Sequence, residues 1–530
     1  MNLNSLSIHE KVCQTMIVKA DPKKHIRLYG SIKGFLEKYP VGGIFIGTEM
    51  FLSGDFDLDG IRKTIEEYQR YSKVPLLVAA DAERGISFLP GNFTDYPPCM
   101  ALGSAKDSEL AYNYGAAIAK EARTVGINWT FAPVCDLNIN RYNEIVGVRS
   151  ISNDPNLSSE MLKSEIEGFA ENGVLTTGKH FPGDGCDVRN QHIVGSVNNL
   201  SKEEWMNTYG RVYKAVFDAG LASVMVGHIS VPAFQNDSVN GIYPPATLSK
   251  DAIGLLKNTL CFKGATITDA MDMGGFVRFR FSRKDAELEA FKSGIDMMLW
   301  PRDETADLIE NAIESGDIPL SRLNDAIDRI AFMKGKLEEF GFGAEENTDP
   351  EFSKETADSL ADRASTLVSN SLGLLPLSKD KIKKIRIVTA SECFLCSPEE
   401  AESATLKKTE KIASMFEKRG AKVDIKTKWD VYLSDYEAGE IDCDYDLILY
   451  LAFANSALPM YSRELVNLHS AQRFDNDKTI VMVIGTPHYL KEYFPVAESA
   501  IHTYDNERCL EAAVASIYGE KPWLGSLPIA

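Results

Sequence analysis

The sequence contains no run of about 18 apolar residues, which is the length that a membrane-spanning helix needs. Its N-terminus also lacks the basic start, apolar stretch and small-residue cleavage site of a secretory signal, so we expect a cytoplasmic protein. Basic residues are few: 57 Lys and Arg stand against 76 Asp and Glu, a net charge of −19. This charge balance argues against nucleic acid or an anionic membrane as a partner.

Cysteine is scarce and scattered, with 9 residues among 530. Only Cys393 and Cys396 form a C-x-x-C pair, and no second pair completes a zinc site. A G-x-G-x-x-G fingerprint and a P-loop are also missing, so nucleotide binding has no support. We therefore expect neither a metal nor an organic cofactor.

Residues 14 to 301 alternate short apolar runs with amphipathic helical stretches. Eight runs have the composition of strands that are covered on both faces: "QTMIVK", "GGIFIG", "LLVAAD", "INWTFAPVCD", "VLTTGKHF", "ASVMVGHI", "GATITDA" and "GIDMMLWP". Helical stretches such as residues 201–220 and 249–264 open on Ser and close near Gly. The pattern predicts an α/β chain whose N-terminal domain, residues 1–345, is a (β/α)8 TIM-type barrel.

A second α/β pattern follows the barrel. Residues 346–375 are expected to form a helical connector that runs into the stretch "LGLLPLSKD", residues 372–380. Residues 376–530 contain the strand candidates "IRIVTAS", "DLILYLAF", "TIVMVIGTP" and "AIHTYD". We expect a smaller α/β sandwich domain, a sheet with helices on its faces.

Polar residues collect where the predicted barrel strands end. In a (β/α)8 barrel these ends share one face, and the active site lies there. Histidine is rare, with 8 in the chain, yet two lie in the loop "GKHFPGDGCDVRNQH". At the other strand ends, Asp136 and His228 are either substrate contacts or buried core residues.

Four motifs, "GKHFPGDG", "FAPVCDLN", "GVRSISNDP" and "ATITDAMDM", together resemble glycoside hydrolase family 3, closest to its β-N-acetylglucosaminidase branch. The resemblance covers the whole barrel, and the smaller domain ending in "GSLPI" is similar to the family's second domain. It implies that Asp269 is the nucleophile. An ionised carboxylate can stabilise an oxocarbenium-like transition state and then form a covalent glycosyl-enzyme.

The branch's acid/base is a histidine on the loop after the fifth strand, and the resemblance assigns this role to His192. Histidine titrates near neutral pH and can act first as acid and then as base. The chain departs from the branch pattern at Asn190, where the branch has aspartate, and at Asp184, where it has histidine. Both are expected to support His192. Either Asp184 or Asp187 compensates for the neutral amide, or His192 is a weaker catalyst, or the loop works differently.

The resemblance also implies a set of sugar ligands at the strand ends. Carboxylate, guanidinium and ammonium groups suit the recognition of hydroxyl groups. The expected substrate-binding residues are Asp81, Arg149, Lys179, His180 and His228.

These expectations describe a retaining exo-acting β-N-acetylglucosaminidase that releases terminal GlcNAc from small carbohydrates through a covalent glycosyl-aspartate. Recycled amino-sugar fragments are its expected substrates. One alternative is a β-glucosidase-type member of the family whose acid/base comes from the second domain. Another is a sugar-binding protein that has lost turnover. The acceptor, water or phosphate, and the oligomeric state stay open.

Overall fold

The computed structural model describes residues 3–48, 57–143, 145–238, 240–277, 282–345, 349–390, 398–426, 445–454, 476–494 and 497–529. The chain divides into two compact units. The first consists of residues 1–95, 108–140 and 154–356, and the second of residues 96–107, 141–153 and 357–530. The second unit thus includes two segments from within the predicted barrel range 1–345. The Cys393–Cys396 pair lies outside the described residues.

Eight short parallel strands of the first unit form a closed ring. Hydrogen bonding gives the orders β10-β1-β2-β3-β4 and β5-β7-β9. Bridges Trp129↔Leu175 and Ile267↔Met297 join the two arcs, so the fold class predicted from the sequence is confirmed. The barrel strands are β1 (Met16–Lys19), β2 (Gly43–Phe45), β3 (Leu77–Ala80), β4 (Trp129–Thr130), β5 (Thr177–Phe181), β7 (Ser223–Val226), β9 (Ala265–Thr268) and β10 (Met298–Leu299). A separate short pair joins β6 (Ser196–Val197) to β8 (Ile229–Ser230).

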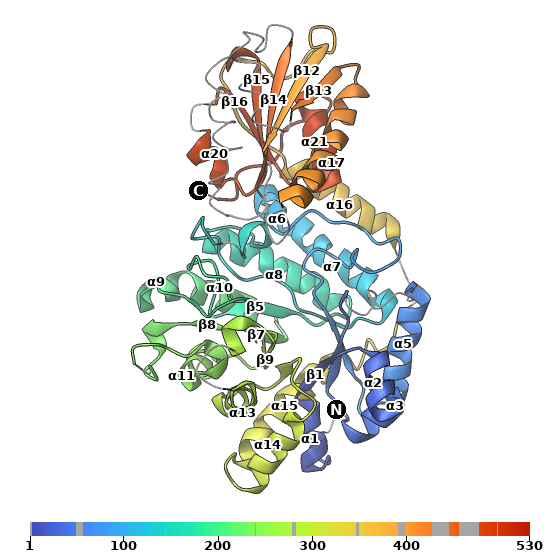
Figure 1. Cartoon of the computed structure of the whole chain (residues 1–530), viewed down its shortest axis with the longest axis vertical. Coiled ribbons are helices and arrows are strands. Elements are labelled where there is room, and N and C mark those ends of the chain that lie inside the picture. Colours follow the sequence, from blue (N-terminus) through green and yellow to red (C-terminus); the bar gives the residue numbers. More distant parts are fainter. Residues whose placement is uncertain are drawn as a thin grey trace. The chain divides into compact units, whose positions relative to one another are not determined.

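Helices alternate with these strands along the chain (Figure 1). They are α1 (Ile8–Gln14), α2 (Pro22–Tyr29), α3 (Ile32–Lys38), α5 (Leu58–Tyr71), α7 (Ser108–Val125), α8 (Pro155–Glu171), α9 (Lys202–Asn207), α10 (Tyr209–Asp218), α11 (Lys250–Gly254), α12 (Gly274–Val277), α13 (Arg283–Ser293), α14 (Thr305–Glu314) and α15 (Leu320–Lys336). Within the described part of the chain, no helix combines the length and the apolar character that a bilayer crossing requires.

The helix predicted over residues 201–220 is two helices. It begins as expected at Ser201, whose side chain and that of Glu204 cap the first turn reciprocally. Thr208, however, has ψ of −94°, outside the helical region, and separates α9 from α10.

The second unit is built on a six-stranded sheet in the order β11-β16-β15-β14-β12-β13. Only β11 is antiparallel to its neighbour. Separate apolar clusters, one around Leu449 and one around Tyr450, lie on the two faces of β14, as in a sheet covered on both sides. Its strands are β11 (Thr366–Asn370), β12 (Lys384–Ala390), β13 (Lys422–Lys426), β14 (Leu447–Ala454), β15 (Thr479–Gly485) and β16 (Ser499–Thr503). Its helices are α6 (Met100–Ala105), α16 (Pro350–Ala364), which begins in the first unit, α17 (Pro398–Glu417), α20 (His488–Tyr493) and α21 (Glu507–Ile517).

The predicted helical connector, residues 346–375, is helical only in part. Helix α16 occupies Pro350–Ala364, but Thr366–Asn370 is strand β11, which pairs with β16. The short segment "TLVSN" has too few residues for its pattern to distinguish a strand from a helix end. Its pairing with residues more than 100 positions later decides its conformation.

Candidate active site

The carboxyl ends of the barrel strands bring the predicted polar residues together. Because the strands run parallel, their ends face the same side of the barrel. Asp81 directly follows β3 and Asp269 directly follows β9. Lys179 and His180 lie within β5, and His228 lies two residues beyond β7. The site therefore has a rigid base made of strand ends.

Lys179 is held between two carboxylates. Its Nζ lies 2.8 Å from Asp81 Oδ1 and 2.6 Å from Glu83 Oε1. The lysine side chain is buried, whereas the side chain of Asp81 is half exposed. An exposed carboxylate with an ordered ammonium behind it suits the binding of sugar hydroxyls.

His180 lies between a buried aspartate and the predicted nucleophile. Its Nδ1 is 2.7 Å from Asp136 Oδ2, and its Nε2 is 4.0 Å from Asp269 Oδ2. Asp136 is 1% exposed, so it acts from inside the protein and orients the imidazole. The ring places its other nitrogen beside the Asp269 carboxylate.

The surroundings of Asp269 favour its ionised form. Burial alone would raise the pKa of its carboxyl, but the neighbouring imidazoles, His180 foremost, together with a backbone hydrogen bond outweigh that effect. The amide of Ala270, which donates to Asp269 Oδ1 at 2.8 Å, acts in the same direction, and the pKa lies below its usual value. An ionised carboxylate at the mouth of a barrel can attack an anomeric carbon. Asp272, a carboxylate three residues further along the same motif and the other possible nucleophile, is more exposed and lies 3.8 Å from Lys19 Nζ.

His228 is buried behind this carboxylate rather than presented to solvent. It is 0% exposed, its Nδ1 is 3.1 Å from Thr247 Oγ1, and its Nε2 is 3.0 Å from the carbonyl oxygen of Ala270. Burial lowers the pKa of the imidazole, which favours the uncharged form. Both ring nitrogens thus have protein partners, and the geometry favours the core role that the sequence left open. Direct contact with substrate stays a prediction.

The predicted acid/base has a partner from its own loop. His192 Nδ1 lies 2.8 Å from Asn190 Oδ1, and the backbone amide of His192 donates to the same oxygen at 2.9 Å. A carbonyl oxygen accepts only, so Nδ1 carries the hydrogen and Nε2 is the nitrogen that can exchange a proton. Asn190 thus fills the geometric role of the branch's aspartate without its charge.

Asp184 occupies a different position from the one expected of a compensating carboxylate. It is 1% exposed, and its Oδ2 accepts a hydrogen bond from Gln191 Nε2 at 3.2 Å. Its backbone amide donates to Asp136 Oδ1 at 2.7 Å. Asp187, the other candidate, accepts from Arg189 Nε at 2.7 Å and from the amide of Val197 at 2.9 Å. The contact with Nδ1 of His192 is made by Asn190.

Arg149, the remaining predicted sugar ligand, lies in the 3-10 helix Gly147–Arg149 of the second unit. Its Nη1 donates to the carbonyl oxygen of Ile145 at 3.3 Å. Its role in sugar binding stays a prediction.

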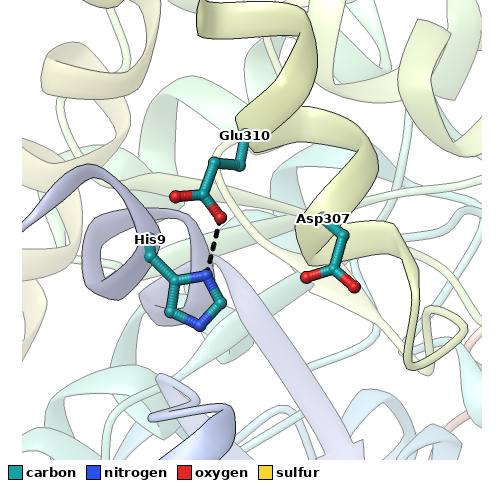
Figure 2. Close-up of side chains that lie close together, drawn as sticks. All are labelled: His9, Asp307 and Glu310. Carbon is teal, nitrogen blue, oxygen red and sulfur yellow. Dashed lines mark hydrogen bonds and ion pairs between the residues drawn. The ribbon is translucent and has the colours of Figure 1, made fainter.

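One group among the described residues has the composition of a metal site: His9, Asp307 and Glu310, shown in Figure 2. Both nitrogens of His9 already have protein partners, Glu310 Oε2 at 2.7 Å and the carbonyl oxygen of Lys38 at 2.8 Å. The cluster therefore functions as an ion pair between α1 and α14, and we assign it no metal. That the chain needs no metal or cofactor stays a prediction.

Three residues of this region were not among those predicted from the sequence. Glu83 follows Asp81 by two positions, and for Asp136 the sequence left open whether it contacts substrate or lies in the core. Gln191 lies between the two loop residues that were singled out, and its buried position could not be inferred from its polarity.

Comparison with known proteins places this geometry in a family. A family model described as the N-terminal domain of glycosyl hydrolase family 3 matches residues 7–333. The β-N-acetylglucosaminidase/β-glucosidase of Cellulomonas fimi is 28% identical over 508 residues, which cover 88% of this chain and 85% of that protein. The β-hexosaminidase LpqI of Mycobacterium tuberculosis is 26% identical over 343 residues, 62% of this chain and 83% of that protein.

Solved structures agree on the fold. The β-glucoside phosphorylase BglX bound to 2FGlc has a TM-score of 0.82 at 28% identity, covering 100% of this chain and 95% of that one. A β-N-acetylglucosaminidase from Paenibacillus sp. has a TM-score of 0.82 at 23% identity, covering 99% of each chain. The family model spans more than half of the sequence, so this chain is an enzyme that belongs to glycosyl hydrolase family 3.

Proposed function

We propose that the protein is a retaining exo-acting β-N-acetylglucosaminidase in which Asp269 is the nucleophile and His192 the acid/base. The observation that carries this proposal is the pair of environments: a buried carboxylate kept ionised beside His180, and a loop histidine whose Nδ1 is fixed by Asn190. Two proteins that this chain matches over most of their length also support it. The protein from Cellulomonas fimi is named a β-N-acetylglucosaminidase/β-glucosidase, and that from Mycobacterium tuberculosis a β-hexosaminidase.

The reaction follows from these two environments. In the first step the protonated imidazole of His192 donates a proton to the leaving oxygen while Asp269 attacks the anomeric carbon, which forms a glycosyl-aspartate. In the second step neutral His192 takes a proton from the acceptor, whose oxygen attacks the same carbon and releases Asp269. Two displacements at one carbon retain its configuration.

Asp81, Lys179 and His180 are proposed to bind the sugar ring. Asp81 offers a half-exposed carboxylate, and its ion pair with the buried Lys179 orients that carboxylate. Arg149 and His228 are also proposed to contact the sugar. The expected cytoplasmic location and the recycled amino-sugar substrates also remain predictions.

A second candidate concerns the acceptor. The chain is similar to a protein named as a β-glucoside phosphorylase, and it has an uncharged amide at Asn190 beside the proposed base. A neutral imidazole with a neutral partner repels an incoming phosphate less than a carboxylate does. Phosphorolysis of the glycosyl-aspartate would release a sugar 1-phosphate in place of the free sugar.

One panel of assays tests these proposals together. Purified protein is given aryl β-N-acetylglucosaminide or aryl β-glucoside, each with and without inorganic phosphate, and the products are identified. Preference for the N-acetylglucosaminide supports the main proposal. Preference for glucoside favours the β-glucosidase-type alternative, and binding without turnover would contradict the proposed activity.

The nucleophile is tested separately. Asp269→Asn should lower kcat by on the order of 10⁴-fold, because no covalent intermediate can form, while the fold is retained. A 2-fluoro or 5-fluoro glycoside should label Asp269 in the unmodified enzyme, as found by mass spectrometry of its peptides. Labelling of Asp272 would overturn the assignment.

A further inference from the structure

The loop that carries His192 is fastened to the barrel through a buried glutamine. Gln191 is 0% exposed although both of its neighbours in the chain are polar loop residues. Its Nε2 donates to Asp184 Oδ2 at 3.2 Å, and its Oε1 accepts the backbone amide of His228 at 2.9 Å. The side chain thus links two points of the β5 loop to the end of β7.

The direction of these hydrogen bonds is fixed by chemistry. A backbone amide can only donate, so the oxygen of Gln191 must face His228 and its NH2 group must face Asp184. Asp184 cannot turn away, because its Oδ1 accepts the amide of Gly185 at 2.7 Å and its own amide is bound to Asp136. A buried glutamine with both ends satisfied is ordered in one orientation.

Glycines allow the loop to lie directly on the neighbouring backbone. A Cβ at Gly227 would come 3.0 Å from Gln191 Oε1, and a Cβ at Gly275 would come 2.5 Å from the Gln191 carbonyl oxygen. The amides of Gly275 and Gly274 donate to the carbonyl oxygens of Gln191 and His192, at 3.1 and 2.8 Å. Gly274 and Gly275 belong to the segment "MDMGG" that follows Asp269. The loop is therefore bound on one side to β7 and on the other to the segment after the nucleophile.

We propose that Gln191 is a positioning residue, which with Asp184 and the amide of His228 fixes the loop so that His192 stays at the nucleophile's side of the barrel. The proposal rests on the proposed function, since it takes His192 as the acid/base. Asn190 fixes the orientation of the His192 ring, and Gln191 fixes the position of the loop backbone that carries it. Asp184 and Asn190, the two departures from the branch pattern, both take part in this arrangement.

The pairing is tested by exchanging its donor and acceptor. Gln191→Glu places a carboxylate against Asp184, and Asp184→Asn places an NH2 group against the NH2 group of Gln191. Each single variant should lose about 10- to 100-fold in kcat/KM on substrates with poor leaving groups, because a displaced acid no longer reaches the leaving oxygen. The double variant, Gln191→Glu with Asp184→Asn, restores one donor against one acceptor. Its new carboxylate still accepts the amide of His228, so it should recover most of that loss.

Activated aryl glycosides provide the readout that distinguishes positioning from a general structural role. They need little acid assistance, so the single variants should lose far less on them. Gln235→Glu is the matched control: Gln235 is 4% exposed and is likewise bound at both ends, to the amide of Val231 and the carbonyl oxygen of Pro244. It should lower the melting temperature without changing the ratio between the two substrate classes.

Several outcomes would overturn the proposal. Equal losses on both substrate classes would show a general structural role, and a double variant that does not recover, or does not fold, would contradict the pairing. Gln191→Ser, which breaks the link without burying a charge, should reproduce the selective loss, and unchanged activity in this variant would also overturn the proposal.

His192→Ala is measured alongside: if it lacks the selective loss, the proposed acid/base fails. If His192→Ala shows the loss and the Gln191 variants do not, only the positioning role fails.

Discussion

The contact between Asn190 and His192 offers a test of the proposed acid/base. Asn190 Oδ1 accepts the Nδ1 hydrogen at 2.8 Å but supplies no negative charge. Asn190→Asp keeps the contact and adds a carboxylate, which favours the imidazolium and should raise the pKa of His192 by about one unit. In the proposed mechanism the first step requires protonated His192, and activity falls as pH rises through that pKa. The alkaline limb of kcat/KM should therefore move upward by a similar amount.

The measurement is kcat/KM between pH 5 and 10 on a substrate with a poor leaving group. Asp184→Asn is the comparison, because it changes a nearby charge that is engaged with Gln191 instead. An alkaline limb that stays in place in Asn190→Asp would mean that another group donates the proton. If phosphate is the acceptor, the added carboxylate should also raise the KM for phosphate.

At the scale of helices, His9 links α1 to α14 through Glu310 (Figure 2). His9 also contacts the carbonyl oxygen of Lys38 at the end of α3. Burial alone would lower the pKa of His9, but hydrogen bonds to the Lys38 carbonyl and the Glu310 carboxylate outweigh it, and the pKa lies above its ordinary value. A histidine whose pKa is raised by folding stabilises the folded state. This contribution is complete below the unfolded-state pKa of about 6.5 and is lost as the pH rises through the folded-state pKa. The unmodified protein should therefore lose its stability advantage over His9→Gln as the pH rises from about 6.5 through the raised pKa of His9.

The advantage should be below about 1 kcal/mol, because both partners are partly exposed and solvent screens the pair. It is measured as the difference in the free energy of unfolding in urea between the two proteins at several pH values. Glu310→Gln should remove the same pH dependence from the partner's side. A difference that is constant with pH would contradict a charged His9.

For the whole molecule, the division into units predicts that the barrel range cannot be cut out intact. Segments 96–107 and 141–153 pack with residues 357–530. The amide of Ser526 donates to the carbonyl oxygen of Ser104 at 3.1 Å, and the hydroxyl of Tyr504 donates to the carbonyl oxygen of Met100 at 3.1 Å. Truncation after residue 345 would expose Met100 and Ile151, which are 0% and 1% exposed in the whole chain.

The truncated chain should aggregate or melt at a lower temperature than the full chain, because a newly exposed apolar patch favours association. Size-exclusion chromatography and thermal unfolding provide the measurement. Tyr504→Phe in the full chain is the mild control and should lower stability by about 1 kcal/mol through its lost hydrogen bonds. A monomeric truncated barrel with the melting temperature of the full chain would contradict this prediction.

The sequence by itself determined the barrel, the family and the face on which the polar residues gather. Buried parallel strands have a local signature, because a strand covered on both faces must be apolar along its length. Asp269 and Lys179 are recognisable because the parallel arrangement brings strand ends to one face wherever the loops run. The eight strand runs and the fold class were thus predictable, and the comparisons confirm the family.

Only the tertiary structure decided which of these polar groups touch one another. The approach of Asp136 to His180, of Gln191 to the amide of His228, and of β11 to β16 joins residues 37 to more than 100 positions apart. Such contacts depend on strand register and on the path of a loop, and these are set by packing between distant segments rather than by local composition. The sequence could identify Asn190 as a departure from the branch pattern. It could not show that the amide oxygen of Asn190 contacts His192, because the path of the loop decides that contact.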